Sequence, residues 1–247
     1  MEGDEERIPG FHAVDEALAA GEALKRIYIP GHRERDPKLA RLISAARQRG
    51  IPLTFQRARH TRLGPSDERW EIYAEVRPFE YAPWAKIREL VRAASAALVV
   101  ALDHIEDPQN LGAVLRNAEG AGATAVVMPQ QRAAAVTAAA RRSSAGATSH
   151  LRIGRVPNIP AALLALKDDG CWVTGLSPAP VALPYDHMDY TRKCVLVVGS
   201  EGKGLSRLVS ERCDALVRIP LRGKVASLNA ASAAAIVLFE AAKQVYA

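Results

Sequence analysis

The sequence predicts an α/β protein in which a small N-terminal module precedes a larger C-terminal domain built on a parallel sheet. Three observations predict this class. From residue 97 onward, apolar runs of strand length alternate with helical patterns. These runs are continuously apolar, as is typical of parallel strands buried on both faces. The first 76 residues alternate in the same way on a smaller scale, and 247 residues are enough for two cores.

The N-terminal module is expected to combine two helices with three strands. Residues 11–20 and 37–48 place their apolar side chains on one helical face, which predicts amphipathic helices. Strands are predicted at residues 27–29, 51–55 and 70–76. Prolines and aromatic residues mark a connection at 78–83. The predicted parts are an N-terminal domain over 1–80, a linker over 81–95 and a C-terminal domain over 96–247. A helix predicted at 84–94 either belongs to the linker or opens the second domain.

The C-terminal domain has strands and helices in strict alternation. Strands are predicted at residues 98–102, 124–128, 151–156, 171–176, 194–198 and 215–219. Helices are predicted at 132–144, 159–168 and 205–212, with a further helix starting near Asn110 and a long alanine-rich helix after Asn229. Ligands of such sheets bind outside the carboxyl ends of the strands, so the loops after residues 198 and 219 are where we expect chemistry.

Composition limits the class of protein. Apolar residues make up 49% and charged residues 24% of the chain, which is typical of a globular protein. The charged first residues do not form a signal peptide, and no apolar run approaches membrane-spanning length. Three widely spaced cysteines have no metal-binding spacing and are expected to be core residues in a reducing compartment. We therefore expect a cytoplasmic protein with no membrane and no metal partner.

A basic band covers residues 24–62 of the N-terminal module. It contains eleven lysines and arginines against two acidic residues, in a chain with a net charge of +6. A solvated helix face is the usual explanation of a basic run. An imbalance of this size favours a nucleic-acid partner instead.

The first cluster of candidate functional residues is Asn110, Gly112 and Arg116. Gly112 permits a close backbone approach in the first turn of a helix. Arg116 follows one turn later on nearly the same face, so the three residues could address one ligand. The alternative is a capped helix with a surface arginine.

The second and third clusters follow two predicted strands. Residues 199–204 carry three glycines around Glu201 and match neither dinucleotide nor phosphate-loop spacing, so a cationic or polar small ligand fits better than phosphate. Residues 219–229 pass from a basic loop into Ser227 and Asn229 at a helix start. Helix capping explains one of these two residues, but not the basic loop before them.

Together the three clusters resemble the signature motifs of the SpoU family of RNA ribose 2'-O-methyltransferases. The opening, residues 8–18, looks like the ribosomal-protein-like N-terminal domain of many members, and residues 141–147 look most like the 23S rRNA guanosine 2'-O-methyltransferases. The resemblance implies a C-terminal domain with a deep trefoil knot, a homodimer, S-adenosylmethionine as cofactor and 23S rRNA as partner. Residues 63–69 depart from the family pattern, which weakens the expected RNA contacts of the N-terminal domain.

The resemblance also implies roles for individual residues. The family's active-site positions correspond to Asn110, Arg116, Glu201, Ser227 and Asn229. Backbone groups at Gly199, Ile219, Leu221 and Leu228 would hold the cofactor. RNA contacts are expected from Arg33, Arg35, Arg41, Arg141, Arg142, Arg222 and Lys224.

The family's proposed activator of the 2'-hydroxyl corresponds to Arg116. A guanidinium normally stays protonated, so we interpret Arg116 as an electrostatic partner of the developing alkoxide or of an adjacent phosphate. The formal base stays open at this point. Three alternatives remain: the same chemistry on tRNA, the same chemistry on another rRNA nucleotide, and a non-catalytic RNA-binding ribosome-assembly factor on the same fold. A dinucleotide-dependent dehydrogenase is disfavoured, because no glycine fingerprint follows residues 98–102.

Overall fold

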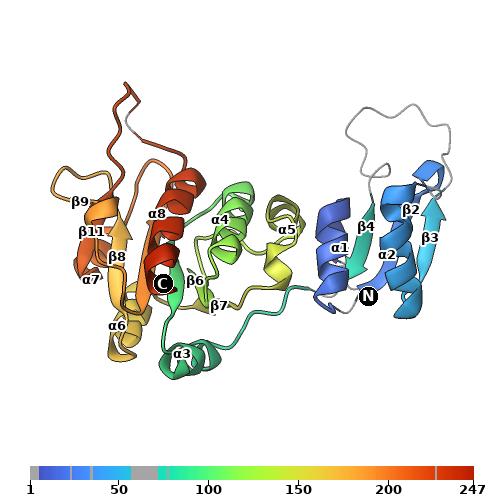
Figure 1. Ribbon diagram of the computed structural model, residues 1–247, viewed down its shortest axis with the longest axis horizontal. Coiled ribbons are helices and arrows are strands. Elements are labelled where there is room, and N and C mark those ends of the chain that lie inside the picture. Colours follow the sequence, from blue (N-terminus) through green and yellow to red (C-terminus); the bar gives the residue numbers. More distant parts are fainter. Residues whose placement is uncertain (1–5, 23, 34–35, 57–71, 77, 226) are drawn as a thin grey trace.

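The computed structural model describes residues 6–22, 24–33, 36–56, 72–76, 78–225 and 227–247. The chain forms two domains that lie side by side along the long axis of the molecule, each with its own sheet (Figure 1). The two expected sheet-containing domains are therefore both present.

The N-terminal domain has a four-stranded sheet with the order β1-β4-β2-β3. Strand β4 pairs antiparallel with β1 and β2, whereas β2 and β3 are parallel. Two helices share a single apolar core with this sheet. The elements are β1 (Glu6–Pro9), α1 (Phe11–Ala19), β2 (Leu24–Pro30), α2 (Pro37–Gln48), β3 (Leu53–Gln56) and β4 (Tyr73–Val76).

Both predicted helices of this domain are confirmed, and α2 shows why. The carboxylate of Asp36 accepts a hydrogen bond from the backbone N–H of Lys38 at 3.0 Å, and Pro37 follows at the first helical position. Leu39, Leu42, Ile43 and Ala46 form the buried face. Strand β1 was not predicted, because a four-residue edge strand containing arginine and proline has no strand signal of its own.

The C-terminal domain has a seven-stranded sheet, and all its paired strands are parallel. The order is β7-β6-β5-β10-β8-β11-β9. The strands are β5 (Leu98–Asp103), β6 (Ala125–Pro129), β7 (Ile153–Val156), β8 (Trp172–Leu176), β9 (Leu183–Pro184), β10 (Cys194–Gly199) and β11 (Ala215–Arg218). The helices are α3 (Trp84–Ala93), α4 (Pro108–Gly120), α5 (Ala138–Ser143), α6 (Ile159–Asp168), α7 (Arg207–Arg212) and α8 (Ala230–Val245). The six predicted strands are confirmed within a few residues, and the two-residue β9 was missed.

Alternate side chains of the central strands enter two separate cores. Leu98 and Val100 of β5 pack with helices α4 and α8, whereas Val99 and Ala101 pack with α3, α6 and α7. Every residue of β5 and β10 is buried. This burial on both faces is the physical reason that the strands read as continuous apolar runs.

Helix α5 is shorter than the sequence predicts. The alanine-rich stretch 132–144 was expected to be helical throughout, but α5 spans only Ala138–Ser143. The backbone N–H of Ala134 donates to the carbonyl of Ile105 at 2.8 Å, and the N–H of Val136 donates to the Tyr81 hydroxyl at 2.9 Å. These tertiary bonds hold residues 133–137 in a non-helical path despite their helix propensity.

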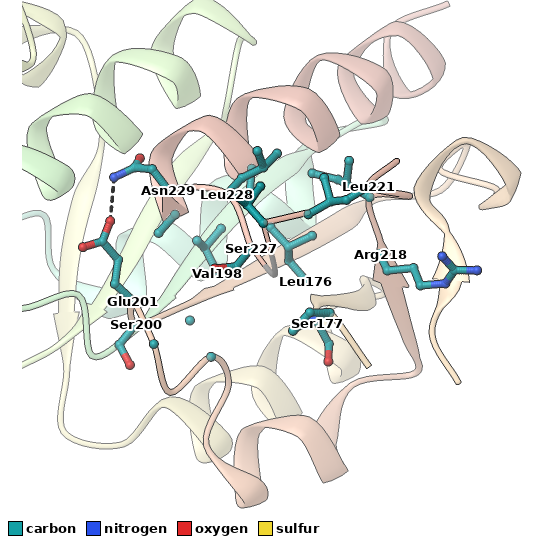
Figure 2. A pocket seen from close by; sticks show the side chains of 18 of the residues that line it. Leu176, Ser177, Val198, Ser200, Glu201, Arg218, Leu221, Ser227, Leu228 and Asn229 are labelled. Atoms are coloured by element: carbon teal, nitrogen blue, oxygen red, sulfur yellow. Dashed lines mark hydrogen bonds between the residues drawn. The ribbon is translucent and has the colours of Figure 1, made fainter. Parts of the chain in front are cut away.

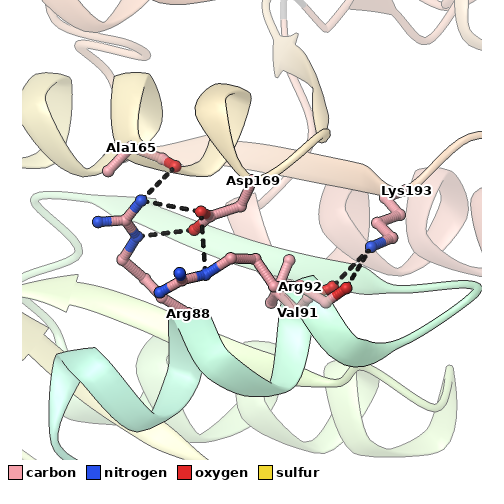
Figure 3. A network of polar contacts seen from close by, with 6 residues as sticks. All are labelled: Arg88, Val91, Arg92, Ala165, Asp169 and Lys193. Carbon is pink, nitrogen blue, oxygen red and sulfur yellow. Dashed lines mark hydrogen bonds and ion pairs between the residues drawn. The ribbon is translucent and has the colours of Figure 1, made fainter.

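Helix α3, which lies in the expected linker, packs firmly against the C-terminal domain. Ile87 and Val91 are completely buried in its second core. Arg88 forms two hydrogen bonds to the buried carboxylate of Asp169, at 2.7 and 2.8 Å. Lys193 donates to two carbonyls at the end of the helix (Figure 3). Because of these bonds, α3 is structurally part of the C-terminal domain.

The two domains meet through α5 and the turn after it. Helix α5 lies between α4 and the N-terminal domain (Figure 1). His150 lies 3.0 Å from the carboxylate of Glu16, and Gly146 sits so close that a Cβ there would lie 2.2 Å from the Cβ of Glu16. Arg141 was expected to contact RNA, but it is only 3% exposed and lies 3.6 Å from the carboxylate of Glu22. This expectation is corrected, because Arg141 lies in the contact between the domains.

Candidate functional site

The candidate site lies at the carboxyl ends of the two central strands. Strands β5 and β10 pair in register, with Asp103 opposite Gly199. The chain therefore leaves the sheet at the same level on both strands, towards His104 on one side and Ser200 on the other. Loops following β8 and β11 reach the same edge.

The glycine-rich loop 199–204 is closed by its own backbone. The N–H of Gly204 donates to the carbonyl of Ser200 at 2.9 Å, and the reverse bond measures 3.2 Å. A Cβ at Gly199 would lie 2.3 Å from the backbone of Gly204, so only glycine fits where the loop returns. Since Ser200 and Gly204 use their N–H groups on each other, they are not available to phosphate. The loop instead presents Glu201.

Asn229 connects all three sequence clusters. Its side-chain oxygen caps α8 by accepting from the N–H groups of Ala231 at 2.9 Å and Ser232 at 3.3 Å. Its amide nitrogen donates to Glu201 at 2.5 Å and to Asn110 at 2.9 Å. Figure 2 shows the bond to Glu201 at one end of the cavity. The cap therefore orients the amide towards the other two clusters.

A cavity of about 480 Å³ opens beside this cluster. Its walls include the apolar side chains of Leu176, Val198, Leu221 and Leu228 (Figure 2). The cavity is also lined by Ile219. Its polar end carries Glu201 and Asn229. Gly199 and Ser227 also line it, so all four expected cofactor-binding residues and three of the five expected catalytic residues surround one cavity.

A second cavity, of about 440 Å³, is also lined by residues of the glycine-rich loop. It shares Ser200, Glu201 and Gly204 with the first cavity, and Asn110 lies in its wall. Sequence reasoning missed two further residues of this wall, Asp103 and His104. The signal was present, because both stand at the carboxyl end of an apolar strand, where functional side chains gather.

Gly112 and Arg116 do not take the positions that the sequence analysis assigned to them. A Cβ at Gly112 would lie 1.8 Å from the Ser143 hydroxyl, so the close approach at this glycine is made by α5 and not by a ligand. Arg116 is exposed on α4 and lines neither cavity. Among the described residues it has no hydrogen bond or ion pair. The expected convergence of Asn110, Gly112 and Arg116 on one ligand is thus limited to Asn110 within a single chain.

The candidate RNA-binding arginines of the N-terminal domain differ in their electrostatic state. Arg33 pairs with Asp36 at 2.8 Å, and this bond, together with the backbone N–H of Lys38, lowers the pKa of Asp36 below its ordinary value. Arg41 is exposed on α2. Arg35 lies outside the described residues. In the C-terminal domain, Arg142, Arg222 and Lys224 are exposed.

All three cysteines are free; Cys171 and Cys194 are core residues, as expected, whereas Cys213 is half-buried at the edge of the core. Burial raises the pKa of Cys171 to about 11 and the pKa values of Cys194 and Cys213 to about 12. Within the described part of the chain, no group of three or more His, Cys, Asp or Glu side chains could hold a metal ion. No helix among those residues is long and apolar enough to cross a membrane.

Two protein-family models match the chain. The model described as the SpoU rRNA Methylase family matches residues 97–239. The model described as RNA 2'-O ribose methyltransferase substrate binding matches residues 7–64. The first match covers the whole candidate site, and the second covers most of the N-terminal domain.

Known proteins are similar to this chain over both of its domains. A protein of Mycolicibacterium gilvum, named an uncharacterized tRNA/rRNA methyltransferase, is 41% identical over 98% of this chain and 77% of its own length. A putative TrmH family tRNA/rRNA methyltransferase of Staphylococcus epidermidis is 35% identical over 94% of this chain and 93% of its own. The crystal structure of the SpoU methyltransferase AviRb from Streptomyces viridochromogenes with AdoMet has the same fold, with a TM-score of 0.76 at 24% identity over 96% of this chain and 89% of that one.

The fold and the matched models define the class as RNA methyltransferases that act on a ribose 2'-hydroxyl. Within that class, the chain belongs to the SpoU family. The resemblance that the three sequence clusters suggested is thereby confirmed.

Proposed function

We propose that this protein transfers a methyl group from S-adenosylmethionine to the 2'-hydroxyl of a guanosine in 23S rRNA, and that it works as a homodimer. The observation that carries the proposal is the junction of Asn110, Glu201 and Asn229, the last two of which line a cavity with several apolar side chains in its walls. Three segments far apart in the sequence supply polar groups to one point next to a pocket of ligand size.

The cavity suits the proposed cofactor in size and in chemistry. Its volume, about 480 Å³, is within the range of small-molecule sites. Ile219, Leu221 and Leu228 would hold the purine and the methionine chain, and backbone groups at Gly199 would complete the pocket. Glu201 supplies negative charge at the polar end, which complements a sulfonium cation. AdoMet is the ligand of the SpoU methyltransferase structure described above, which has the same fold.

The protein's own residues would orient the acceptor and disperse charge. S-adenosylmethionine, when bound, supplies an already activated methyl group, so the enzyme must align the ribose oxygen with it. Asn229 fixes Glu201 and Asn110 in place by its two donated bonds. Ser227 lies at the cavity wall with its hydroxyl exposed. Arg116, exposed on α4, would stabilise the RNA phosphate next to the target or the developing alkoxide.

Ribosomal RNA is the proposed substrate because the chain has a separate domain for binding RNA. The N-terminal domain matches the substrate-binding model, and its basic band supplies the charge that phosphate binding requires. Arg142, Arg222 and Lys224 are exposed in the C-terminal domain and would extend that surface. The choice of guanosine rests on the likeness of residues 141–147 to the 23S rRNA guanosine enzymes.

A homodimer is supported by an apolar stripe on the outside of α8. Ile236, Phe239 and Tyr246 are 37, 52 and 47% exposed and recur on one helical face. Phe239 lies beside Gly120 of α4, so the stripe continues onto the helix that carries Arg116. The Phe239→Lys variant should lower the mass in light scattering from twice 26.6 kDa to 26.6 kDa. A variant that stays dimeric would show that the dimer interface is not at this stripe.

We also propose that residues 194–247 are threaded as the deep trefoil knot implied by the family resemblance. Strand β10 lies between β5 and β8 in the middle of the sheet, and α8 packs back onto β10 and α4. The cavity loops 199–204 and 219–229 converge at this place.

The decisive experiment is methyl transfer from labelled S-adenosylmethionine to unmodified 23S rRNA, followed by mapping of the product. One 2'-O-methylated guanosine is the expected result. Methyl transfer to tRNA but not to rRNA would support the proposed reaction and show that tRNA is the substrate. Binding of RNA without any binding of the cofactor would leave an RNA-binding assembly factor as the function.

A further inference from the structure

The second cavity contains an aspartate–histidine pair whose geometry is unusual. Asp103 is 1% exposed and uses both carboxylate oxygens. One accepts from the N–H of Ser206 at 2.6 Å, and the other lies 2.7 Å from Nδ1 of His104. A buried carboxylate in this position orients an imidazole by accepting its Nδ1 proton. The Nε2 atom, on the opposite side of the ring, is then left as an acceptor.

The backbone at His104 is held in a conformation that few residues adopt. His104 has φ +60°, in the left-handed region, where a side chain other than glycine costs about 1–2 kcal/mol. Among the described residues, only two others besides glycine have a positive φ, and one of them, Arg132, lines the same cavity. Such strain gathers at functional sites, where the surrounding structure enforces it.

The location of His104 relates it to the methyl-transfer site. Its neighbour Asp103 pairs with Gly199 across the central strands, and His104 shares a cavity with Asn110 and Glu201. That cavity adjoins the proposed cofactor pocket through Ser200 and Glu201. An acceptor ribose in the second cavity would therefore lie next to the methyl donor in the first.

The other polar groups at this place are less suited to remove a proton. Glu201 already accepts a short hydrogen bond from Asn229, and a guanidinium such as that of Arg116 stays protonated. The ionisable groups that line the second cavity are Asp103, His104, Glu106, Asp107, Arg132, Glu201 and Lys203. Within this described set, an imidazole is the side chain type that accepts and releases protons most readily near neutral pH.

We propose that His104, oriented by Asp103, is a further catalytic residue that contacts the acceptor ribose and accepts the proton of its 2'-hydroxyl. The inference rests on the proposed methyltransferase function. The O–H bond breaks and its proton passes to Nε2 of His104. The oxygen forms the new bond to the methyl carbon, while the electron pair of the methyl–sulfur bond stays on sulfur. The imidazolium then returns its proton to water.

Two substitutions remove the imidazole of His104 and should leave the fold intact. His104→Gly removes the ring and relieves the left-handed strain, so the protein should stay folded. His104→Asn keeps a side chain that tolerates a positive φ but cannot take up a proton. His187→Asn is the matched control, because His187 is an exposed histidine outside both cavities. Affinity for S-adenosylmethionine, measured by calorimetry, should be the same in all three variants and the wild type.

Methyl transfer to 23S rRNA should fall by roughly 10²- to 10⁴-fold in kcat for both His104 variants, the usual contribution of a general base. Added imidazole should restore part of the rate of His104→Gly, and His187→Asn should match the wild type. Wild-type activity in His104→Asn would overturn the proposal. If the wild type itself transfers no methyl group to RNA, the proposed function fails as well, which is a distinguishable outcome.

A second readout does not depend on turnover. With ring-labelled histidine, the His104 signals in a nuclear magnetic resonance spectrum, assigned by their loss in His104→Gly, should shift when a guanosine-containing RNA is added without cofactor. Unshifted signals under conditions where the RNA is bound would show that His104 does not contact the acceptor, and would overturn the proposal.

Discussion

The side-chain amide of Asn229 donates a hydrogen bond of 2.5 Å to the carboxylate of Glu201, which joins the start of the last helix to the glycine-rich loop. The same side chain accepts two backbone N–H groups of α8 and donates its other proton to Asn110. All its hydrogen-bonding capacity is therefore used, and a single residue type satisfies both the helix cap and the site.

Replacing Asn229 by aspartate should separate these two roles. Aspartate caps helices as well as asparagine does, so the thermal midpoint should change little. It cannot donate to Glu201 or Asn110, and it places a second carboxylate next to Glu201. Methyl transfer should fall by about 10²-fold or more, as when one preorganised donor is lost.

Asn229→Ala is the comparison for this prediction. It removes the donors and also the cap, which costs about 1 kcal/mol of stability. Full activity in Asn229→Asp, or equal stability of the two variants in urea denaturation, would contradict the dual role.

The contact between the domains can be tested at Gly146. Gly146 has φ +95°, and an added Cβ would lie 2.2 Å from the Cβ of Glu16. Gly170 has φ +89°, with nothing near an added Cβ. Both alanine variants should therefore be destabilised by the same left-handed strain. The free energy of unfolding of Gly146→Ala should fall by about 1–3 kcal/mol more, because of the clash. Equal urea midpoints would show that the domains do not pack in this way in solution.

The basic band should not act uniformly. Arg33 is neutralised by Asp36, whereas Arg41 is exposed on α2 and available to phosphate. In filter binding at several salt concentrations, Arg41→Ala should reduce the salt slope of RNA affinity by about one unit. Arg33→Ala should have a smaller effect. Identical slopes for wild type and Arg41→Ala would show that this part of the band is only a solvated face.

The buried thiols predict a loss of stability at alkaline pH. Burial raises the pKa of Cys194 to about 12 from an ordinary value of 9.0. Below pH 9 the thiol is protonated in both states, so its contribution is fully present. Between pH 9 and about 12 the unfolded chain releases the proton and the folded one keeps it, which lowers the free energy of unfolding by about 1.4 kcal/mol per pH unit for each such thiol.

Urea denaturation at pH 8 and pH 10 measures this slope. Cys194→Ala should reduce the slope of the free energy of unfolding against pH by the contribution of one thiol, even if the variant is less stable at both pH values. An unchanged slope would contradict the assignment of Cys194 as a thiol that stays protonated in the folded protein.

The sequence by itself determined the elements that depend on local chemistry. Continuous apolar runs predicted the strands of the larger sheet, and Asp36 followed by Pro37 marked the start of α2, because these signals act within a few residues. The three clusters with their spacing indicated the SpoU family and supplied more than half of the residues that line the first cavity.

Only the tertiary structure decided which residues meet. Arg141 is buried because α5 packs between the two domains, and Gly112 is small because α5 crosses it, neither of which has a local signal. Residues 133–137 are not helical because distant carbonyl and hydroxyl groups bind their N–H groups. Likewise, Asp103 and His104 reach the site because β5 and β10 pair in register. Pairing and packing join positions that are distant in the sequence, and propensity along the chain contains no information on them.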